Sequence, residues 1–144
     1  MSAIPNHALR QLRAGKLAIG LGVHQARTVG IAQIAKTAGF DWLFIDCEHS
    51  SLDLDAAAQL ATAALPVGVT PVVRVAGFEH WHASRLLDNG AQGIVFPHVD
   101  SAADAKKVAD ACRFPPAGGH TTDKTPFAIG GGPRKSSFGD GGGP

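Results

Sequence analysis

The chain has 144 residues, a formal net charge of +1 and hydrophobic residues at 44% of its positions. This length suffices for one domain with a hydrophobic core, and a near-neutral charge argues against nucleic-acid binding driven by bulk electrostatics. No stretch approaches the ~18 apolar residues that a membrane span needs. The two cysteines, Cys47 and Cys112, lie far apart and match no zinc spacing. We therefore expect a soluble cytoplasmic protein with reduced thiols.

The predicted elements alternate between strands and helices after a first helix that spans residues 6–15. Asn6, Ser101 and either Ser51 or Asp53 have the side chains that cap helix N-termini. The predicted strands are 17–23, 41–46, 70–75 and 93–97, and the helices that follow them are 28–37, 54–65, 80–89 and 101–112.

This alternation predicts parallel strands joined by right-handed crossovers, in either a doubly wound sheet or part of a (β/α)8 barrel of about four βα units. Near-continuous apolar strands favour a sheet that is covered on both faces. Gly20 and Gly22 in the first strand indicate the close approach of another backbone or of a ligand. Four further glycines mark tight helix-to-strand turns, namely Gly15, Gly39, Gly68 and Gly90.

The composition changes abruptly after Arg113. Residues 118–144 are dominated by Gly, Pro, Lys, Ser and Thr, with no apolar period. Such a segment buries too little surface to offset its ordering entropy. We expect residues 1–117 to form the folded unit and residues 118–144 to form a disordered or aberrant tail.

Polar side chains gather where the predicted strands end. Because the carboxyl ends of parallel strands meet at one edge, where active sites form, these side chains are candidates for one site. The candidates are His24, Gln25, Asp46, Glu48, His49, Arg74 and His98.

His49 is a candidate general base because imidazole titrates near neutrality. It needs a carboxylate to fix its tautomer, and Asp46, Glu48 and Asp88 all remain candidates. Arg74 offers a planar fork for a carboxylate or a developing oxyanion. Each of these residues, taken alone, has the alternative of an ordinary solvated surface position.

His80 and His82 have the composition of a metal pair. Their i, i+2 spacing at the start of a helix does not place them on one helical face. We therefore expect them not to be ligands.

Four segments resemble the 4-hydroxy-2-oxoheptanedioate aldolase/citrate lyase family. They are FDWLFIDCEH at 40–49, TPVVRV at 70–75, LLDNGAQGIVFP at 86–97 and the beginning of a further signature, RFPPAG, at 113–118. The resemblance is collinear from about Gly15 to Gly118, and it implies a (β/α)8 barrel that is usually hexameric.

The resemblance further implies a carbon–carbon lyase that depends on Mg²⁺, Mn²⁺ or Co²⁺ and acts in the catabolism of aromatic compounds. Its substrates would be a 4-hydroxy-2-oxoacid, or pyruvate (or a related 2-oxoacid) with an aldehyde. By position, His49 would be the proton acceptor, Asp88 would raise its basicity and Arg74 would bind substrate and stabilise the enolate. Asp46 and Glu48 would support the site, with Glu48 near the water shell of the metal.

The chain also departs from the family pattern. The family barrel has eight strands, and its metal-binding Glu and Asp come from later segments than the four strands predicted here. We expect no metal ligands in this chain, weak or no lyase activity, and a tail that arises from a truncated or frameshifted reading frame. The alternatives are a non-catalytic half-barrel assembly module and a flavodoxin-like binding domain, although the first loop lacks a phosphate-binding glycine pattern.

Overall fold

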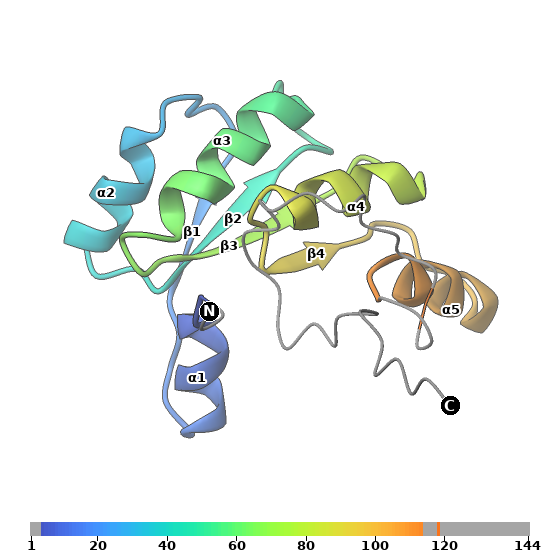
Figure 1. Ribbon diagram of the computed structural model, residues 1–144, viewed down its shortest axis with the longest axis horizontal. Coiled ribbons are helices and arrows are strands. Elements are labelled where there is room, and N and C mark those ends of the chain that lie inside the picture. Colours follow the sequence, from blue (N-terminus) through green and yellow to red (C-terminus); the bar gives the residue numbers. More distant parts are fainter. Residues whose placement is uncertain (1–3, 114–117, 119–144) are drawn as a thin grey trace, which may run out of the picture.

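The computed structural model describes residues 4–113 and 118, and these form one parallel sheet with helices between its strands (Figure 1). The strands are β1 (Gly20–Val23), β2 (Trp42–Asp46), β3 (Thr70–Arg74) and β4 (Gly93–Val95). The helices are α1 (His7–Arg13), α2 (Gly30–Thr37), α3 (Leu54–Ala64), α4 (His80–Asp88) and α5 (Ala102–Ala111). All predicted elements are therefore present, and the predicted tail 118–144 lies outside the described residues except for Gly118.

The strand order distinguishes between the two predicted sheet types. The strands pair in the order β1-β2-β3-β4, and every pair is parallel. A doubly wound sheet reverses its strand order at a switch point, whereas a barrel adds each new strand beside the last. The arrangement is that of consecutive βα units of a barrel.

Helices α2, α3 and α4 lie on the same side of the sheet (Figure 1). Leu43, Ile45 and Val73 point toward them and are fully buried, with Leu60 of α3 in the same core. Alternate strand residues point to the opposite face, which we call the inner face. Its residues in register include Gly22, Phe44, Val72 and Gly93.

The sequence predicts a sheet that is covered on both faces. The described helices cover one of these faces. The inner face carries partly buried residues such as Trp42 and Phe44, whose rings meet edge to face at 6.2 Å. A Cβ added at Gly20 would overlap the Trp42 indole. The group that approaches Gly20 closely is thus the Trp42 side chain, whereas the sequence led us to expect a backbone or a ligand.

Local signals in the sequence account for the ends of the elements. The side chains of Asn6, Asp53 and Ser101 accept hydrogen bonds from the backbone at the starts of α1, α3 and α5, which confirms the predicted caps. Gly39 after α2 and Gly90 after α4 have φ of +86° and +102°, a left-handed conformation that glycine adopts without strain. These turns return the chain to the amino edge of the sheet.

Helix α1 lies at that amino edge, below the strands in Figure 1. The backbone N–H of Ala8 donates to the buried hydroxyl of Thr70 at 3.0 Å, and the amide of Asn6 donates to the Gln92 carbonyl at 3.4 Å. These bonds tie α1 to the starts of β3 and β4, at the amino edge. The opposite, carboxyl edge carries the candidate site.

Candidate active site

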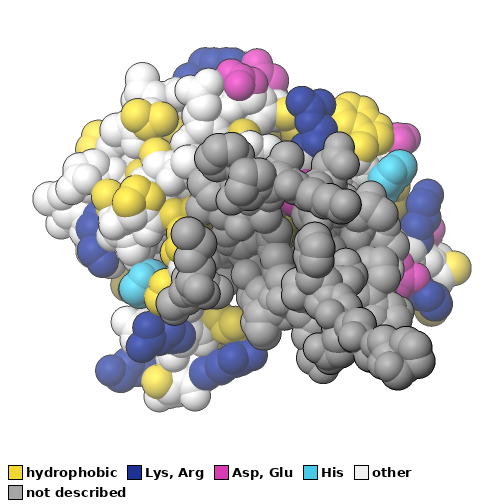
Figure 2. Space-filling view, in the orientation of Figure 1, with side chains coloured by type: hydrophobic (Ala, Val, Ile, Leu, Met, Phe, Trp, Pro, Cys, Tyr) yellow, Lys and Arg dark blue, Asp and Glu magenta, His cyan; other side chains and the backbone are white. Residues whose placement is uncertain are grey.

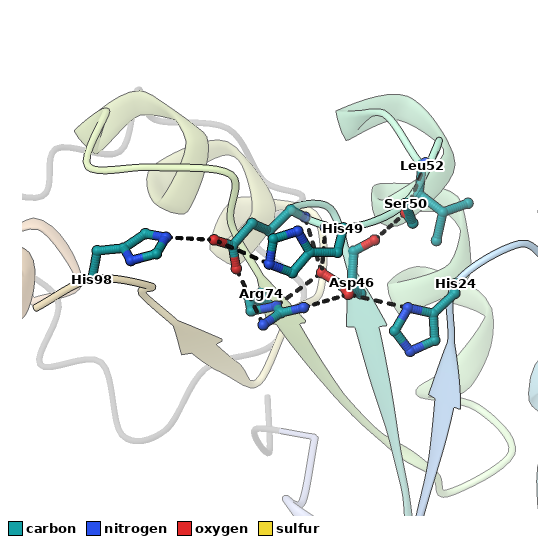
Figure 3. Close-up of polar contacts among 8 residues, drawn as sticks. His24, Asp46, His49, Ser50, Leu52, Arg74 and His98 are labelled. Atoms are coloured by element: carbon teal, nitrogen blue, oxygen red, sulfur yellow. Dashed lines mark hydrogen bonds and ion pairs between the residues drawn. The ribbon is translucent and has the colours of Figure 1, made fainter.

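The carboxyl ends of the strands bring five charged or polar side chains into one row (Figure 3). Asp46 and Arg74 end β2 and β3 and are register partners, while His24 follows β1 and His98 follows β4. The row runs His98, Glu48, Arg74, Asp46, His24 through contacts of 2.9, 3.1, 2.5 and 3.1 Å. The predicted edge cluster is therefore assembled.

Asp46 is the centre of this row and has no exposed surface. Its carboxylate accepts from Arg74 Nε at 2.9 Å and from Nη2 at 2.5 Å, a bidentate pairing. The Arg74 hydrogen bonds lower the pKa of Asp46 far below its usual range, outweighing the opposite effect of burial. Asp46 is thus a fixed anion at neutral pH.

The loop after β2 folds around the same carboxylate. Asp46 Oδ1 accepts from the backbone N–H of Glu48 at 2.9 Å and from that of His49 at 3.2 Å, which is an Asx-type turn. The Ser50 hydroxyl donates to the Asp46 carbonyl oxygen and accepts from the Leu52 N–H. These local bonds explain why the Asp-Cys-Glu-His segment turns at once and presents its side chains at the edge.

Arg74 is held on two sides and remains 23% exposed. Its Nη1 lies 3.1 Å from Glu48 Oε2, and the guanidinium stands over the Phe44 ring at 5.5 Å. The hydrogen bonds to Asp46 raise the pKa of Arg74 above its usual value. Bonds to described residues account for three of its five N–H groups, so two can bind a ligand.

His49 and His98 both approach the same oxygen of Glu48. His98 Nε2 is 2.9 Å from Glu48 Oε1, whereas His49 Nε2 is 3.7 Å away, beyond hydrogen-bond length. The His49 side chain is 68% exposed, and His98 has a φ of +54°, which is uncommon for a residue other than glycine. Of the three carboxylates considered as partners of the His49 ring, Glu48 is therefore the one that lies close to it.

Asp88 lies elsewhere in the chain. It is the last residue of α4, which runs from the carboxyl edge back to the amino edge, and the following Asn89 accepts from Thr62 near the end of α3. The length of β2, roughly 15 Å, separates that edge from His49. Of the five residues to which the resemblance gives a role, the structure brings together four, and it leaves Asp88 at the opposite edge within one chain.

The sequence analysis selects His24 and His98 as candidates because each follows a predicted strand, but it gives neither of them a function. The signal that selects them is their place directly after β1 and β4, since their side chains reach the acids of β2 and its loop. Neither has a sequence motif of its own. Their pairing depends on the spatial order of the strands.

Cys47 lies within the cluster's own loop and is partly buried. Burial raises the pKa of its thiol to about 11, so the reactive thiolate is scarce at neutral pH. Cys47 and Cys112 are both free thiols, as predicted.

Metal ligands are not grouped in the part of the chain that the structure describes. No set of three or more His, Cys, Asp or Glu side chains there could hold an ion. Glu48 already binds Arg74 and His98, while His80 and His82 lie on α4 outside the row. The described residues thus do not form a metal centre by themselves.

Comparisons with known proteins agree with this architecture. The chain matches the family described as HpcH/HpaI aldolase/citrate lyase over residues 24–129. It is 45% identical over 123 residues to the 4-hydroxy-4-methyl-2-oxoglutarate aldolase tasA of Hapsidospora irregularis, covering 82% of this chain and 44% of that protein. It is 41% identical over 118 residues to the hydroxypyruvate/pyruvate aldolase of Agrobacterium fabrum, with the same two coverages.

Solved structures show the same fold. An HpcH/HpaI aldolase from Desulfitobacterium hafniense superposes with a TM-score of 0.75 and 30% identity, covering 80% of this chain and 44% of that one. A family protein from Burkholderia cenocepacia gives 0.71 and 30%, covering 81% and 48%. The chain therefore spans a little under half the length of these four relatives, and the predicted partial barrel is confirmed. The described residues contain no helix long and apolar enough to cross a membrane.

Proposed function

Because the chain belongs to the HpcH/HpaI aldolase/citrate lyase family, we propose that it carries the base and the enolate-stabilising group of an aldolase. The reaction is the reversible cleavage of a 4-hydroxy-2-oxoacid to pyruvate, or a related 2-oxoacid, and an aldehyde or ketone. One observation carries the proposal. Arg74 is locked by two carboxylates next to His49 and keeps two N–H groups for a ligand.

The proposed chemistry assigns one step to each side chain. His49 accepts the proton of the 4-hydroxyl while the C3–C4 bond breaks, and the electron pair passes into the enolate of the 2-oxoacid. Arg74 stabilises the enolate oxygen with preorganised positive charge, which costs no reorganisation during the reaction. Asp46 and Glu48 position Arg74, so their role is to orient the guanidinium.

The metal belongs to the same proposal. The family resemblance implies Mg²⁺, Mn²⁺ or Co²⁺, which would polarise the 2-oxoacid as a Lewis acid. Since the described residues do not form a ligand set, its ligands have to come from outside them. The roles given above to His49 and Arg74 do not depend on where the ion sits.

The substrate class follows from two kinds of relative. The fungal relative is named for 4-hydroxy-4-methyl-2-oxoglutarate and the bacterial one for hydroxypyruvate and pyruvate. Pyruvate is therefore the proposed donor half, and 4-hydroxy-4-methyl-2-oxoglutarate, which divides into two pyruvates, is the first substrate to test.

The test measures pyruvate release from 4-hydroxy-4-methyl-2-oxoglutarate by the purified chain, with each metal and with a chelator. We expect weak, metal-stimulated release that falls to the uncatalysed rate in His49→Asn, because general base catalysis contributes roughly 10²–10⁴-fold. His80→Asn, an exposed histidine of α4 outside the row, is the matched control and should retain the rate. Release that is insensitive to His49→Asn would contradict the assignment.

Asp88 enters the proposal through a second copy of the chain. Asp88 and His49 of one chain lie at opposite edges, so the role of raising the basicity of His49 is assigned to Asp88 of a neighbouring copy in a cytoplasmic homo-oligomer. Mixing His49→Asn with Asp88→Asn should then restore about a quarter to a half of the activity, because some sites receive one intact residue from each variant. A mixture as inactive as its components would contradict a shared site.

A non-catalytic assembly module is the second candidate, and the exposed edge of the sheet favours it. Among the described strands, β1 and β4 each pair on one side only. Leu12 of α1 and Leu17 before β1 are well exposed, at 59% and 77%, and Figure 2 shows hydrophobic side chains among the Lys and Arg around α1. Unpaired strand edges promote association. A stable oligomer by size-exclusion chromatography that releases no pyruvate would favour this candidate.

A further inference from the structure

The proposed function leaves two residues of the row without a role, His98 and His24, and the one that reaches the buried Asp46 is His24. It follows β1 directly, and its ring folds back over Gly22 on the inner face. A Cβ placed on Gly22 would lie 3.5 Å from His24 Nε2 and 3.7 Å from Cδ2. The imidazole therefore occupies the space that a side chain at position 22 would fill. Gly22 is the register partner of Phe44, which lies two residues before Asp46 on the same face of β2.

The ring is fixed through one of its nitrogens. His24 Nδ1 lies 3.1 Å from Asp46 Oδ2, and Figure 3 shows this contact at the end of the row opposite His98. This contact is an ion pair, and because an ionised carboxylate only accepts hydrogen bonds, it favours the form of the imidazole that carries a hydrogen on Nδ1. A carboxylate that holds Nδ1 in this way orients the imidazole and leaves Nε2 for proton exchange, which is the arrangement of an acid–base pair.

His24 and His49 are attached to different carboxylates. His49 approaches Glu48, His24 approaches Asp46, and Arg74 bridges the two acids. His49 is in the loop beyond β2 and is 68% exposed, whereas His24 is 53% exposed with its Nε2 edge against Gly22. The aldol reaction moves two protons, one at the 4-hydroxyl and one at C3 of the pyruvate half. The geometry offers one imidazole for each.

We propose that His24 is a second proton-transfer residue and that it exchanges the proton at C3 of the 2-oxoacid bound to Arg74. This assignment rests on the proposed function. After C3–C4 cleavage, the enolate electron pair at C3 takes the proton from His24 Nε2, forming the C3–H bond and breaking the Nε2–H bond. The neutral imidazole regains a proton from water, to which His49 releases the proton taken from the 4-hydroxyl. The net result is one proton moved from oxygen to C3, with no external oxidant or reductant.

The experiment follows deuterium incorporation at C3 of pyruvate in D2O by proton NMR, with the divalent metal present. His24→Asn keeps an N–H donor close to the position of Nδ1 beside Asp46, but removes Nε2. We expect it to slow exchange by roughly 100-fold or more, while the rate of the first-turnover release of the carbonyl product stays near the wild-type value. His49→Asn should show the reverse, with exchange retained and cleavage lost.

Substitutions at Gly22 provide an independent route to the same loss. Gly22→Leu places a side chain where the imidazole lies, so exchange should fall although His24 is still present. Gly22→Ala adds a methyl group at ordinary contact distance from the ring and should retain exchange. Thermal unfolding of each variant checks that the fold is intact.

Wild-type exchange in His24→Asn would overturn the assignment, as would equal losses of exchange and cleavage, which indicate that His24 only supports Asp46. If His24→Asn and His49→Asn lose the same half-reaction, the division of labour is also wrong. A wild-type chain that catalyses neither exchange nor cleavage with metal present overturns the proposed function and this inference with it. Exchange without cleavage in the wild-type chain, abolished in His24→Asn, would support the inference and contradict the proposed overall reaction.

Discussion

Replacing Arg74 with Met is expected to lower the free energy of unfolding by about 3–5 kcal/mol at neutral pH. The reason is the state in which it leaves Asp46. That carboxylate has no exposed surface, and its two bonds to Arg74 are the main cause of its lowered pKa. Without the guanidinium, the buried charge keeps two backbone N–H groups and the half-exposed His24. Urea unfolding followed by circular dichroism measures the effect.

Two further variants distinguish a lost charge partner from lost packing. Arg85 stands over Trp81 at 6.0 Å on the exposed surface of α4, so Arg85→Met should change stability by well under about 1 kcal/mol. The double variant Arg74→Met/Asp46→Asn removes the buried charge as well and should recover part of the loss. A double variant as unstable as the sum of its single changes would show that the Asp46–Arg74 pairing is not the cause.

Acid is expected to remove stability through the same carboxylate. The pKa of Asp46 is lowered in the folded protein, so the unfolded chain binds the proton more tightly. The contribution is therefore complete above about pH 5 and is lost as the pH falls toward the folded pKa, which lies below the usual carboxyl range. Roughly 2–3 kcal/mol should disappear between about pH 5 and pH 2.

Arg74→Met provides the comparison for this acid profile. In that variant burial acts on Asp46 without the guanidinium, so the pKa is no longer held low and the slope of stability against pH over this interval should be much smaller. Chemical unfolding at a series of pH values measures both slopes. Parallel profiles for the two proteins would mean that other carboxylates dominate the acid sensitivity.

These expectations connect stability to the proposed chemistry. Burying the Asp46–Arg74 pair carries a desolvation penalty, and removing one partner destabilises the fold strongly. The pair holds a guanidinium with two remaining N–H groups at the sheet edge. A buried ion pair is a poor source of net stability by itself. In the proposed mechanism, its role is to fix the position of Arg74 relative to His24 and His49.

The local structure was predictable because its causes are local. The caps at Asn6, Asp53 and Ser101 follow from side chains that accept backbone hydrogen bonds, and the turns at Gly39 and Gly90 follow from positive φ angles. The edge cluster was predictable too, because parallel strands end together. The first strand begins later than predicted, at Gly20, since Ile19 donates instead to the Asp41 side chain at 2.9 Å.

The sequence by itself determined the elements, the edge that carries the site and the family, because residue type and spacing settle these without knowledge of neighbouring strands. The tertiary structure decided which charges meet. Strand order places Asp46 between His24 and Arg74, Glu48 between Arg74 and His98, and Asp88 at the far edge. These pairings join residues that are distant along the chain. They depend on register and on the direction of α4, which side-chain identity alone does not encode.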